Sequence, residues 1–182
     1  MFFMIQINQH ISLQEIQFID ASSLYSLMQE VYPHAYQQFW NDNCSWYLNS
    51  QYSESNIYKE LQNIKANYYF VLYKGKRIGN FRIIWDDILP GFENLKCVKL
   101  HRIYLHQSSQ GNGIGKILLD WFEYKSIENN YDLLWLDAMN KKEQAYIFYQ
   151  KRGYKYHSHT YLNFELIKKE YSQMSQLYKI LT

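Results

Sequence analysis

One glycine-rich stretch carries the clearest chemical signal in this sequence. Three of the seven glycines fall in Gln110-Gly111-Asn112-Gly113-Ile114-Gly115-Lys116, between a segment with a strand-like pattern and one with a helical pattern. Glycine permits positive φ and close approach of a ligand to the backbone. The first amides of a helix lack internal partners and lie at the positive end of its dipole. The turn therefore suits a phosphate group.

The spacing of this turn excludes two common nucleotide-binding loops. A P-loop requires Gly five positions before Gly115 and Ser or Thr after Lys116, but the sequence has Gln110 and Ile117 there. The dinucleotide fingerprint requires Gly in place of Lys116, and its acidic residue is matched only loosely by Asp137. A tight turn without any ligand is the remaining alternative, although one glycine would suffice for it.

The same residues match a third motif. Gln110, Gly113 and Gly115 fit the pattern Gln/Arg-x-x-Gly-x-Gly/Ala of the GNAT superfamily of acetyltransferases, which the chain resembles. The preceding segment Leu100–Leu105 is similar to the strand before the motif in this family. The following segment Ile117–Leu119 is similar to the helix after it.

A second matching segment lies further along the chain. Ala145–Tyr154 is similar to the family pattern A-x-x-F-Y-x-K-x-G-F/Y, so the resemblance covers most of the chain. The stretch Tyr36–Leu61 is weakly similar to the acceptor-side helices of the polyamine (spermidine) acetyltransferase branch. Two positions depart from the family: Lys142 stands where many members have Asn, and Lys99 where some have a glutamate base. We expect the first change to loosen one cofactor contact, and the second leaves the general base unassigned.

The resemblance implies acetyl-coenzyme A (acetyl-CoA) as the acetyl donor. Ile103, Tyr104 and Leu105 are expected to bind this cofactor, and the main-chain groups of Ile103 and Leu105 are expected to pair with the pantetheine arm as though it were an extra strand. The stretch Gln110–Lys116 is expected to bind the same cofactor, with the amides from residue 111 to 116 around its pyrophosphate. The Lys116 side chain either adds charge to the phosphates or is simply solvated.

Tyr149, in the second segment, is the candidate general acid. Amine attack on a thioester produces an oxyanion and then a thiolate, so a backbone donor and a nearby acid both lower the barrier. A phenol pKa near ~10 suits protonation of a thiolate whose conjugate thiol has a pKa near ~8.5. The alternative is a core aromatic on the helix face of Ala145 and Phe148. No cysteine lies in the matched segments, which favours direct attack in a ternary complex over a covalent acetyl-enzyme.

His101 is the candidate general base. It lies on the strand that leads to the turn, where some members of the superfamily place a histidine. An imidazole with an unperturbed pKa near ~6.5 can take the proton of the incoming amine. A structural histidine is one alternative, and a water relay to Glu93 or Asp86 is another.

The elements that must position these residues follow from periodicity. A helix is expected from an N-cap at Ser12 to a stop near Pro33. Gly153, in the left-handed αL conformation, is expected to end the helix predicted over Lys142–Arg152. Further helices are expected at Ser55–Ile64, Gly113–Asn129 and Lys142–Arg152. Strands are expected at Phe3–Asn8, Asn67–Tyr73, Arg77–Trp85, Cys97–His106, Leu133–Ala138, Tyr154–Leu166 and Met174–Leu181, the second and third joined as a hairpin by Lys74-Gly75-Lys76. The resemblance implies an α/β (α+β) fold whose central mixed, mostly antiparallel sheet is splayed at the acetyl-CoA strand, with helices on both faces.

Composition sets the wider expectations. The 182 residues fit a single N-acetyltransferase domain spanning 1–182. The 19 basic and 17 acidic side chains are scattered, so neither a nucleic acid nor a membrane is expected as a partner. Only Cys44 and Cys97 are present, without the spacing of a disulfide framework or a zinc site, which favours a reducing cytoplasm and no metal.

The sequence therefore predicts an acetyl-CoA-dependent N-acetyltransferase that acts on a primary amine. The expected acceptor is a polyamine or another small amine, and a protein or peptide amine is the second choice. An acetyl-CoA-binding module without turnover is the alternative, kept open by Lys142 and the missing glutamate. Whether the chain forms a homodimer is left open.

Overall fold

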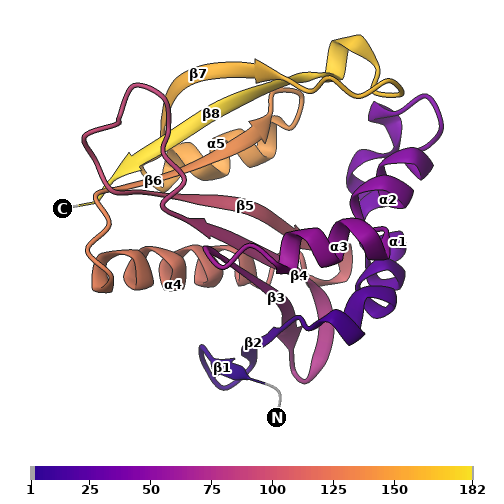
Figure 1. Cartoon of the computed structure of the whole chain (residues 1–182), viewed down its shortest axis with the longest axis horizontal. Helices are drawn as coiled ribbons and strands as arrows, with labels where there is room; N and C mark the ends of the chain where they lie inside the picture. The colour runs from indigo at the N-terminus through magenta and orange to yellow at the C-terminus, as the bar shows by residue number, and fades with distance from the viewer. Residues whose placement is uncertain (1–2, 182) are drawn as a thin grey trace.

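An eight-stranded sheet organises the part of the chain, residues 3–181, that the computed structural model describes. The strand order is β1-β2-β3-β4-β5-β6-β8-β7, which places the N-terminal strands at one end and β7 and β8 at the other (Figure 1). The strands are β1 (Met4–Gln6), β2 (Ile11–Glu15), β3 (Ala66–Tyr73), β4 (Lys76–Trp85), β5 (Cys97–Leu105), β6 (Leu133–Met139), β7 (Lys155–Tyr161) and β8 (Gln173–Ile180).

The pairing of β5 with β6 is parallel, and every other neighbouring pair in the described sheet is antiparallel. The parallel register runs from Cys97↔Leu133 to Leu100↔Leu136 and stops there, although both strands continue. On its other side β5 stays paired with β4 as far as Leu105. The sheet is therefore mixed, mostly antiparallel and opened between β5 and β6, as the sequence predicted.

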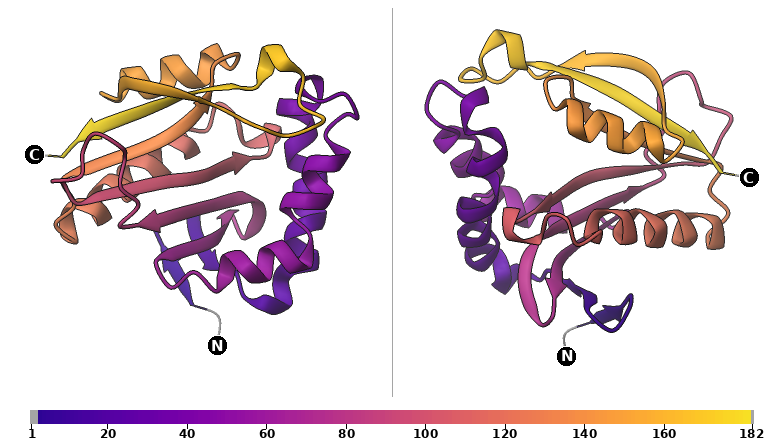
Figure 2. Two further views of the ribbon diagram at one scale, coloured as in Figure 1. Left: turned by 45° about the horizontal axis from the view of Figure 1, so that its top comes forward. Right: turned by 180° about the vertical axis from the view of Figure 1, so that it is seen from behind.

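Helices cover both faces of the sheet (Figure 2). Alternate residues of β3 point to opposite faces: Tyr68 and Phe70 pack in one core with α1, α2 and α3, whereas Tyr69 and Val71 pack in the other with α4 and Tyr149 of α5. The helices are α1 (Ala21–Tyr36), α2 (Ser45–Gln51), α3 (Glu54–Leu61), α4 (Ile114–Glu128) and α5 (Glu143–Lys151), with short 3-10 turns at Phe18–Asp20, Gln37–Phe39, Gln107–Ser109 and Lys169–Tyr171. No helix in the described range is long and apolar enough to cross a bilayer.

The predicted helix from Ser12 is wrong at both ends. Ser12 lies inside β2, because this segment hydrogen-bonds with β1 and β3 and that pairing overrides its near-helical spacing. The helix begins at Ala21 and passes through Pro33. Proline removes one internal hydrogen bond, but the helix continues to Tyr36, where the amide of Gln37 donates to the carbonyl of Pro33. Tyr36 also stacks on Tyr32 at 4.7 Å between ring centroids.

The helix α2 is not among the helices expected from periodicity. The other predicted elements match the structure within a few residues, apart from the strand predicted over Tyr154–Leu166. That strand ends at Tyr161. The chain then crosses to the face of the sheet covered by α1, α2 and α3, where Ile167 is buried in the same core as α1. Gly153 has a φ of +86°, as expected for a left-handed helix stop.

Candidate active site

A cavity of about 220 Å³ occupies the gap where β5 and β6 separate. Its walls come from α1, α2, β5, β6, α5 and the segment after β7. Aromatic and titratable side chains share this lining, among them Tyr36, Tyr47, His101, Tyr104, Lys142 and Tyr149. The fold therefore brings both predicted catalytic residues, His101 and Tyr149, to one cavity.

The edge of β5 that faces β6 is open beyond Leu100. The amide of His106 donates to the carbonyl of Ile78 at 2.7 Å, so at position 106 the backbone faces β4. Backbone groups alternate in direction along an antiparallel strand. Those of Ile103 and Leu105 consequently face the gap, where an extended ligand could pair with them, while Tyr104 turns its backbone to β4.

The glycine-rich turn follows β5 and leads into α4. Gly111 and Gly113 have φ of +79° and +69°, and a Cβ built on either would meet no protein atom within 4 Å. Within residues 3–181, the backbone amides from residue 111 to 116 have no hydrogen-bond partner in the protein. An open surface of unpartnered amides at the start of a 15-residue helix fits a pyrophosphate.

The side chains of the turn are peripheral to that surface. Gln110 and Lys116 are exposed, and Asn112 donates from its amide to the carbonyl of Ser109 at 3.3 Å. Ile114 points inward and is buried in the core beneath the sheet. Gly115 lies 3.7 Å, measured from an ideal Cβ, from the ring of Phe148. The turn is thus anchored by Ile114, and its backbone amides from residue 111 to 116 form an open surface.

Tyr149 lies on α5 with its side chain buried and its ring in the cavity wall. The ring packs edge-on against Tyr154, 5.6 Å away, so the residue is also part of the core. Burial, and next the nearby Tyr36, raise the pKa of the Tyr149 phenol above its ordinary value. In the described part of the chain its hydroxyl has no hydrogen-bond partner, so it is available as a donor.

His101 is the extra residue of a β-bulge. Arg82 of β4 pairs with Arg102 and Ile83 pairs with Leu100, so His101 has no partner across the ladder. Its Nδ1 lies 2.8 Å from Nη1 of Arg82. The bulge falls directly after the last β5–β6 pair, at the mouth of the gap.

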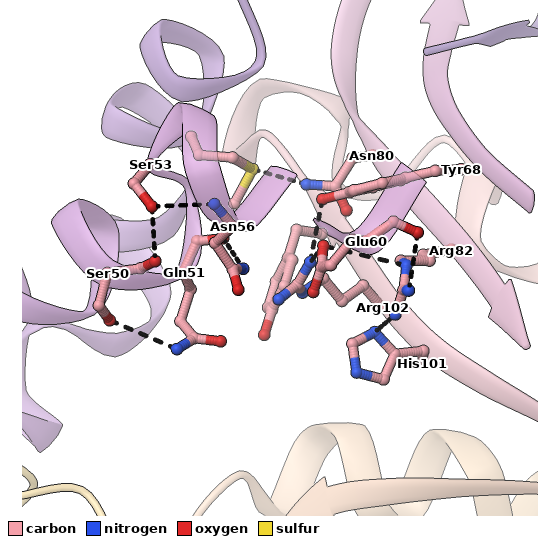
Figure 3. A network of polar contacts seen from close by, with 12 residues as sticks. Ser50, Gln51, Ser53, Asn56, Glu60, Tyr68, Asn80, Arg82, His101 and Arg102 are labelled. Carbon is pink, nitrogen blue, oxygen red and sulfur yellow. Dashed lines mark hydrogen bonds and ion pairs between the residues drawn. The ribbon is translucent and has the colours of Figure 1, made fainter. Parts of the chain in front are cut away.

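A buried ion cluster lies behind this bulge (Figure 3). Glu60 of α3 pairs with Arg102 at 2.5 Å and approaches Nε of Arg82 at 3.9 Å. Tyr68 accepts a hydrogen bond from Arg102 at 3.2 Å. Sequence reasoning missed this cluster, although two arginines among apolar residues of neighbouring strands signal buried charges that need a carboxylate.

A stack of tyrosines forms the wall on the α1 and α2 side. Tyr32 lies between Tyr36 and Tyr47, at 4.7 Å and 4.3 Å between ring centroids. The ammonium of Lys142 lies 4.9 Å from the Tyr36 ring centroid, a cation–π contact, and burial lowers its pKa. Lys142, flagged in the sequence as a departure, thus faces the cavity. Tyr36 and Tyr47 belong to the stretch Tyr36–Leu61 singled out in the sequence, but the stacking of these rings on Tyr32 was not predicted.

The carboxylates named in the predicted water relay lie elsewhere. Glu93 accepts a hydrogen bond from the amide of Gly91 in an exposed loop, and Asp86 accepts from Tyr131. Among the described residues, the cavity lining includes one carboxylate, Asp137 of β6, which pairs with Lys99 at 2.7 Å. At the position where some members of the superfamily have a glutamate base, this chain thus has Lys99, whose ammonium is paired with Asp137.

Comparison with known proteins identifies the class to which this fold and cavity belong. The model of the acetyltransferase (GNAT) domain matches residues 65–156, from β3 to the start of β7. The chain belongs to this family. An uncharacterised N-acetyltransferase in the pepI 3′ region of Lactobacillus delbrueckii subsp. lactis is 29% identical over 107 residues. That match spans 59% of this chain and 62% of the relative, less than two thirds of its length.

Solved structures share the fold over nearly the whole chain. The PaiA N-acetyltransferase of Thermoplasma acidophilum, in complex with coenzyme A, has a TM-score of 0.70 at 16% identity, covering 93% of this chain and 98% of that one. A mutant of the spermidine N-acetyltransferase SpeG of Vibrio cholerae has 0.66 at 14%, covering 96% and 95%. The enzyme of Salmonella typhimurium that modifies the N-terminal serine of a 50S ribosomal subunit protein has 0.69 at 15%, covering 99% and 100%. At these identities the likeness concerns the fold alone.

Proposed function

We propose that this protein transfers the acetyl group of acetyl-CoA to a primary amine. The observation that carries the proposal is the continuity of three features. Residues of β5 line the cavity that holds Tyr149, and the edge of this strand is open beyond Leu100. The strand then leads into the glycine-rich turn with its unpartnered amides. A phosphate-bearing, extended donor would thus lead its reactive end into a cavity that holds a proton donor.

In this proposal acetyl-CoA supplies a thioester whose carbonyl carbon the amine attacks. The amides from residue 111 to 116 bind the pyrophosphate, and the peptide groups of Ile103 and Leu105 hold the pantetheine arm. Tyr149 gives its phenol proton to the departing thiolate. The phenol is protonated across the neutral range at its ordinary pKa, and burial, which raises that pKa, keeps the proton in place until the thiolate departs.

The two thiols support direct attack by the amine rather than a covalent acetyl-enzyme. Cys97 is buried beneath the β4–β5 loop with Leu89 and Trp135, and Cys44 is buried among the helices. Burial raises the pKa of both thiols, which makes them poor nucleophiles. Neither belongs to the cavity lining.

The charges of the cavity bear on the acceptor. A polyamine is one candidate, and a protein or peptide amine is another. In the lining Lys99 is paired with Asp137, and Arg102 is paired with Glu60 behind the wall. Lys142 has no carboxylate partner among the described residues, so its ammonium is the uncompensated charge of the lining. A second ammonium on the acceptor would therefore meet positive charge, which favours an amine with a single positive charge over spermidine.

A thiol-release assay with a panel of amines tests the proposal. The panel should contain spermidine, a monoamine of similar length and a short peptide with a free N-terminus. We expect acceptor-dependent release of free coenzyme A together with a product heavier by one acetyl group. Coenzyme A binding without release on any amine would refute turnover and leave a binding module. Faster turnover of spermidine than of the monoamine would overturn the charge argument alone.

A further inference from the structure

The polar network behind the cavity ends at the imidazole of His101 (Figure 3). Its Nδ1 lies 2.8 Å from Nη1 of Arg82. A guanidinium has only donors and keeps its charge in proteins. Nδ1 must therefore accept this hydrogen bond, and a neutral ring then carries its one proton on Nε2. In Figure 3 the second ring nitrogen points away from Arg82.

Burial and the surrounding cations keep the ring neutral. Burial is the largest cause that lowers the pKa of His101 well below its ordinary value, followed by Arg102 and Arg82, and then Lys99. Two carboxylates face this region from other elements, Glu60 from α3 and Asp137 from β6. Both are paired with these cations and partly offset them, but the three cations Arg82, Arg102 and Lys99 outnumber the two carboxylates.

These contacts conflict with the role of base that the sequence suggested. A base needs a lone pair on the nitrogen that faces the reactants, but in this tautomer that nitrogen bears the hydrogen. Turning the lone pair toward the cavity would move the proton to Nδ1, where it would oppose the N–H of Arg82. The buried guanidinium would then lose a hydrogen bond that it could not replace from solvent.

We infer that His101 is a neutral hydrogen-bond donor whose Nε2–H binds the carbonyl oxygen of the acetyl group in the cavity. Arg82 is the positioning residue that fixes the tautomer. The inference rests on the proposed acetyl transfer, because it names a residue for that reaction. A fixed donor stabilises negative charge that develops on the oxygen without any proton transfer. A neutral imidazole is suited to this task, since its N–H remains in place through the reaction. The bulge places it where the gap opens.

Two substitutions separate a donor from a base. In His101→Gln the side-chain oxygen can accept from Arg82 and the amide nitrogen can donate into the cavity, yet an amide cannot take a proton at neutral pH. We expect this variant to keep kcat within about tenfold of wild type. His101→Leu, of similar volume, should lose about 10²- to 10³-fold in kcat with little change in the KM of the acceptor. His101→Leu should melt at a lower temperature than His101→Gln, because Arg82 loses its acceptor, so circular dichroism at the assay temperature serves as the control that both variants are folded.

The outcomes are distinct. If wild type turns over and His101→Gln is as inactive as His101→Leu, the donor role is refuted while acetyl transfer stands. A rise in acceptor KM with unchanged kcat in His101→Leu would assign the donor to the acceptor and overturn the carbonyl assignment. A wild-type protein without turnover on any amine would refute the proposed function itself.

The tautomer can be measured without turnover. In ¹⁵N spectra of histidine-labelled protein, the ring signals missing from His101→Gln identify His101 among the six histidines. We expect these signals to show a protonated Nε2 and an unprotonated Nδ1, unchanged from pH 8 to about 5.5. Titration with a midpoint near ~6.5, the ordinary value, or a proton on Nδ1 would overturn the inference.

Discussion

Replacement of Gly113 by Ala tests whether the glycine-rich turn binds coenzyme A. Gly113 has a φ of +69°, and an added Cβ would meet no protein atom within 4 Å. The variant should therefore fold, at a cost of about 1–2 kcal/mol for left-handed backbone. In a chain of this size that loss lowers Tm by about 2–4 °C per kcal/mol. The new methyl group would, however, occupy the open surface that we assign to the pyrophosphate.

The matched control is Gly75→Ala in the β3–β4 hairpin. Gly75 has a φ of +78° and equally open surroundings, so the backbone cost should be the same. Calorimetry should show a Kd for coenzyme A raised at least tenfold, about 1.4 kcal/mol, in Gly113→Ala only. Wild-type affinity in Gly113→Ala, or equal loss in both variants, would refute the assignment of the turn.

Three further results are expected. Tyr149→Phe keeps the ring in the core and removes the acid, so kcat should fall about 10²-fold while Tm and the Kd for coenzyme A stay nearly unchanged. If kcat stays near the wild-type value when chemistry is rate-limiting, Tyr149 is a packing residue. The rate should rise with pH as the acceptor amine loses its proton, and because burial raises the pKa of Tyr149, this acid should cause no decline before about pH 9; a falling limb in that range would contradict this. Glu60→Ala leaves Arg82 and Arg102, whose side chains are 5% and 4% exposed, without a carboxylate, so urea unfolding should show a loss of about 3–5 kcal/mol; a loss below about 1 kcal/mol would mean that the cluster is solvated.

Local signals made much of this fold predictable. The β3–β4 hairpin follows from its turn, since Lys74 and Gly75 both adopt positive φ, the geometry that a two-residue hairpin requires. The helix after the glycine-rich turn follows from the spacing of its apolar residues. In both cases the residues that set the structure are close together in the chain.

What escaped prediction depends on residues far apart in the sequence. Ser12 lies in a strand because its segment pairs with β3, about 60 residues later, and no local pattern reveals that register. Glu60 and Arg102 form an ion pair across 42 positions. The place of Lys142 against the Tyr36 ring likewise depends on how α1 and α5 approach each other. The tautomer that we infer for His101 also cannot be predicted until its partner Arg82 is known.

The short seam between β5 and β6 has a thermodynamic consequence. Four residue pairs join the N-terminal half of the sheet to the half formed by β6, β8 and β7. A ligand held along the open edge of β5 would lengthen this connection, so binding and the cohesion of the two halves are linked. At a coenzyme A concentration of 100 times Kd, such linkage stabilises the folded chain by about 2.7 kcal/mol. Amide hydrogen exchange in the seam, at residues 97–100 and 133–136, should slow on binding, whereas exchange at the β3–β4 hairpin should change less.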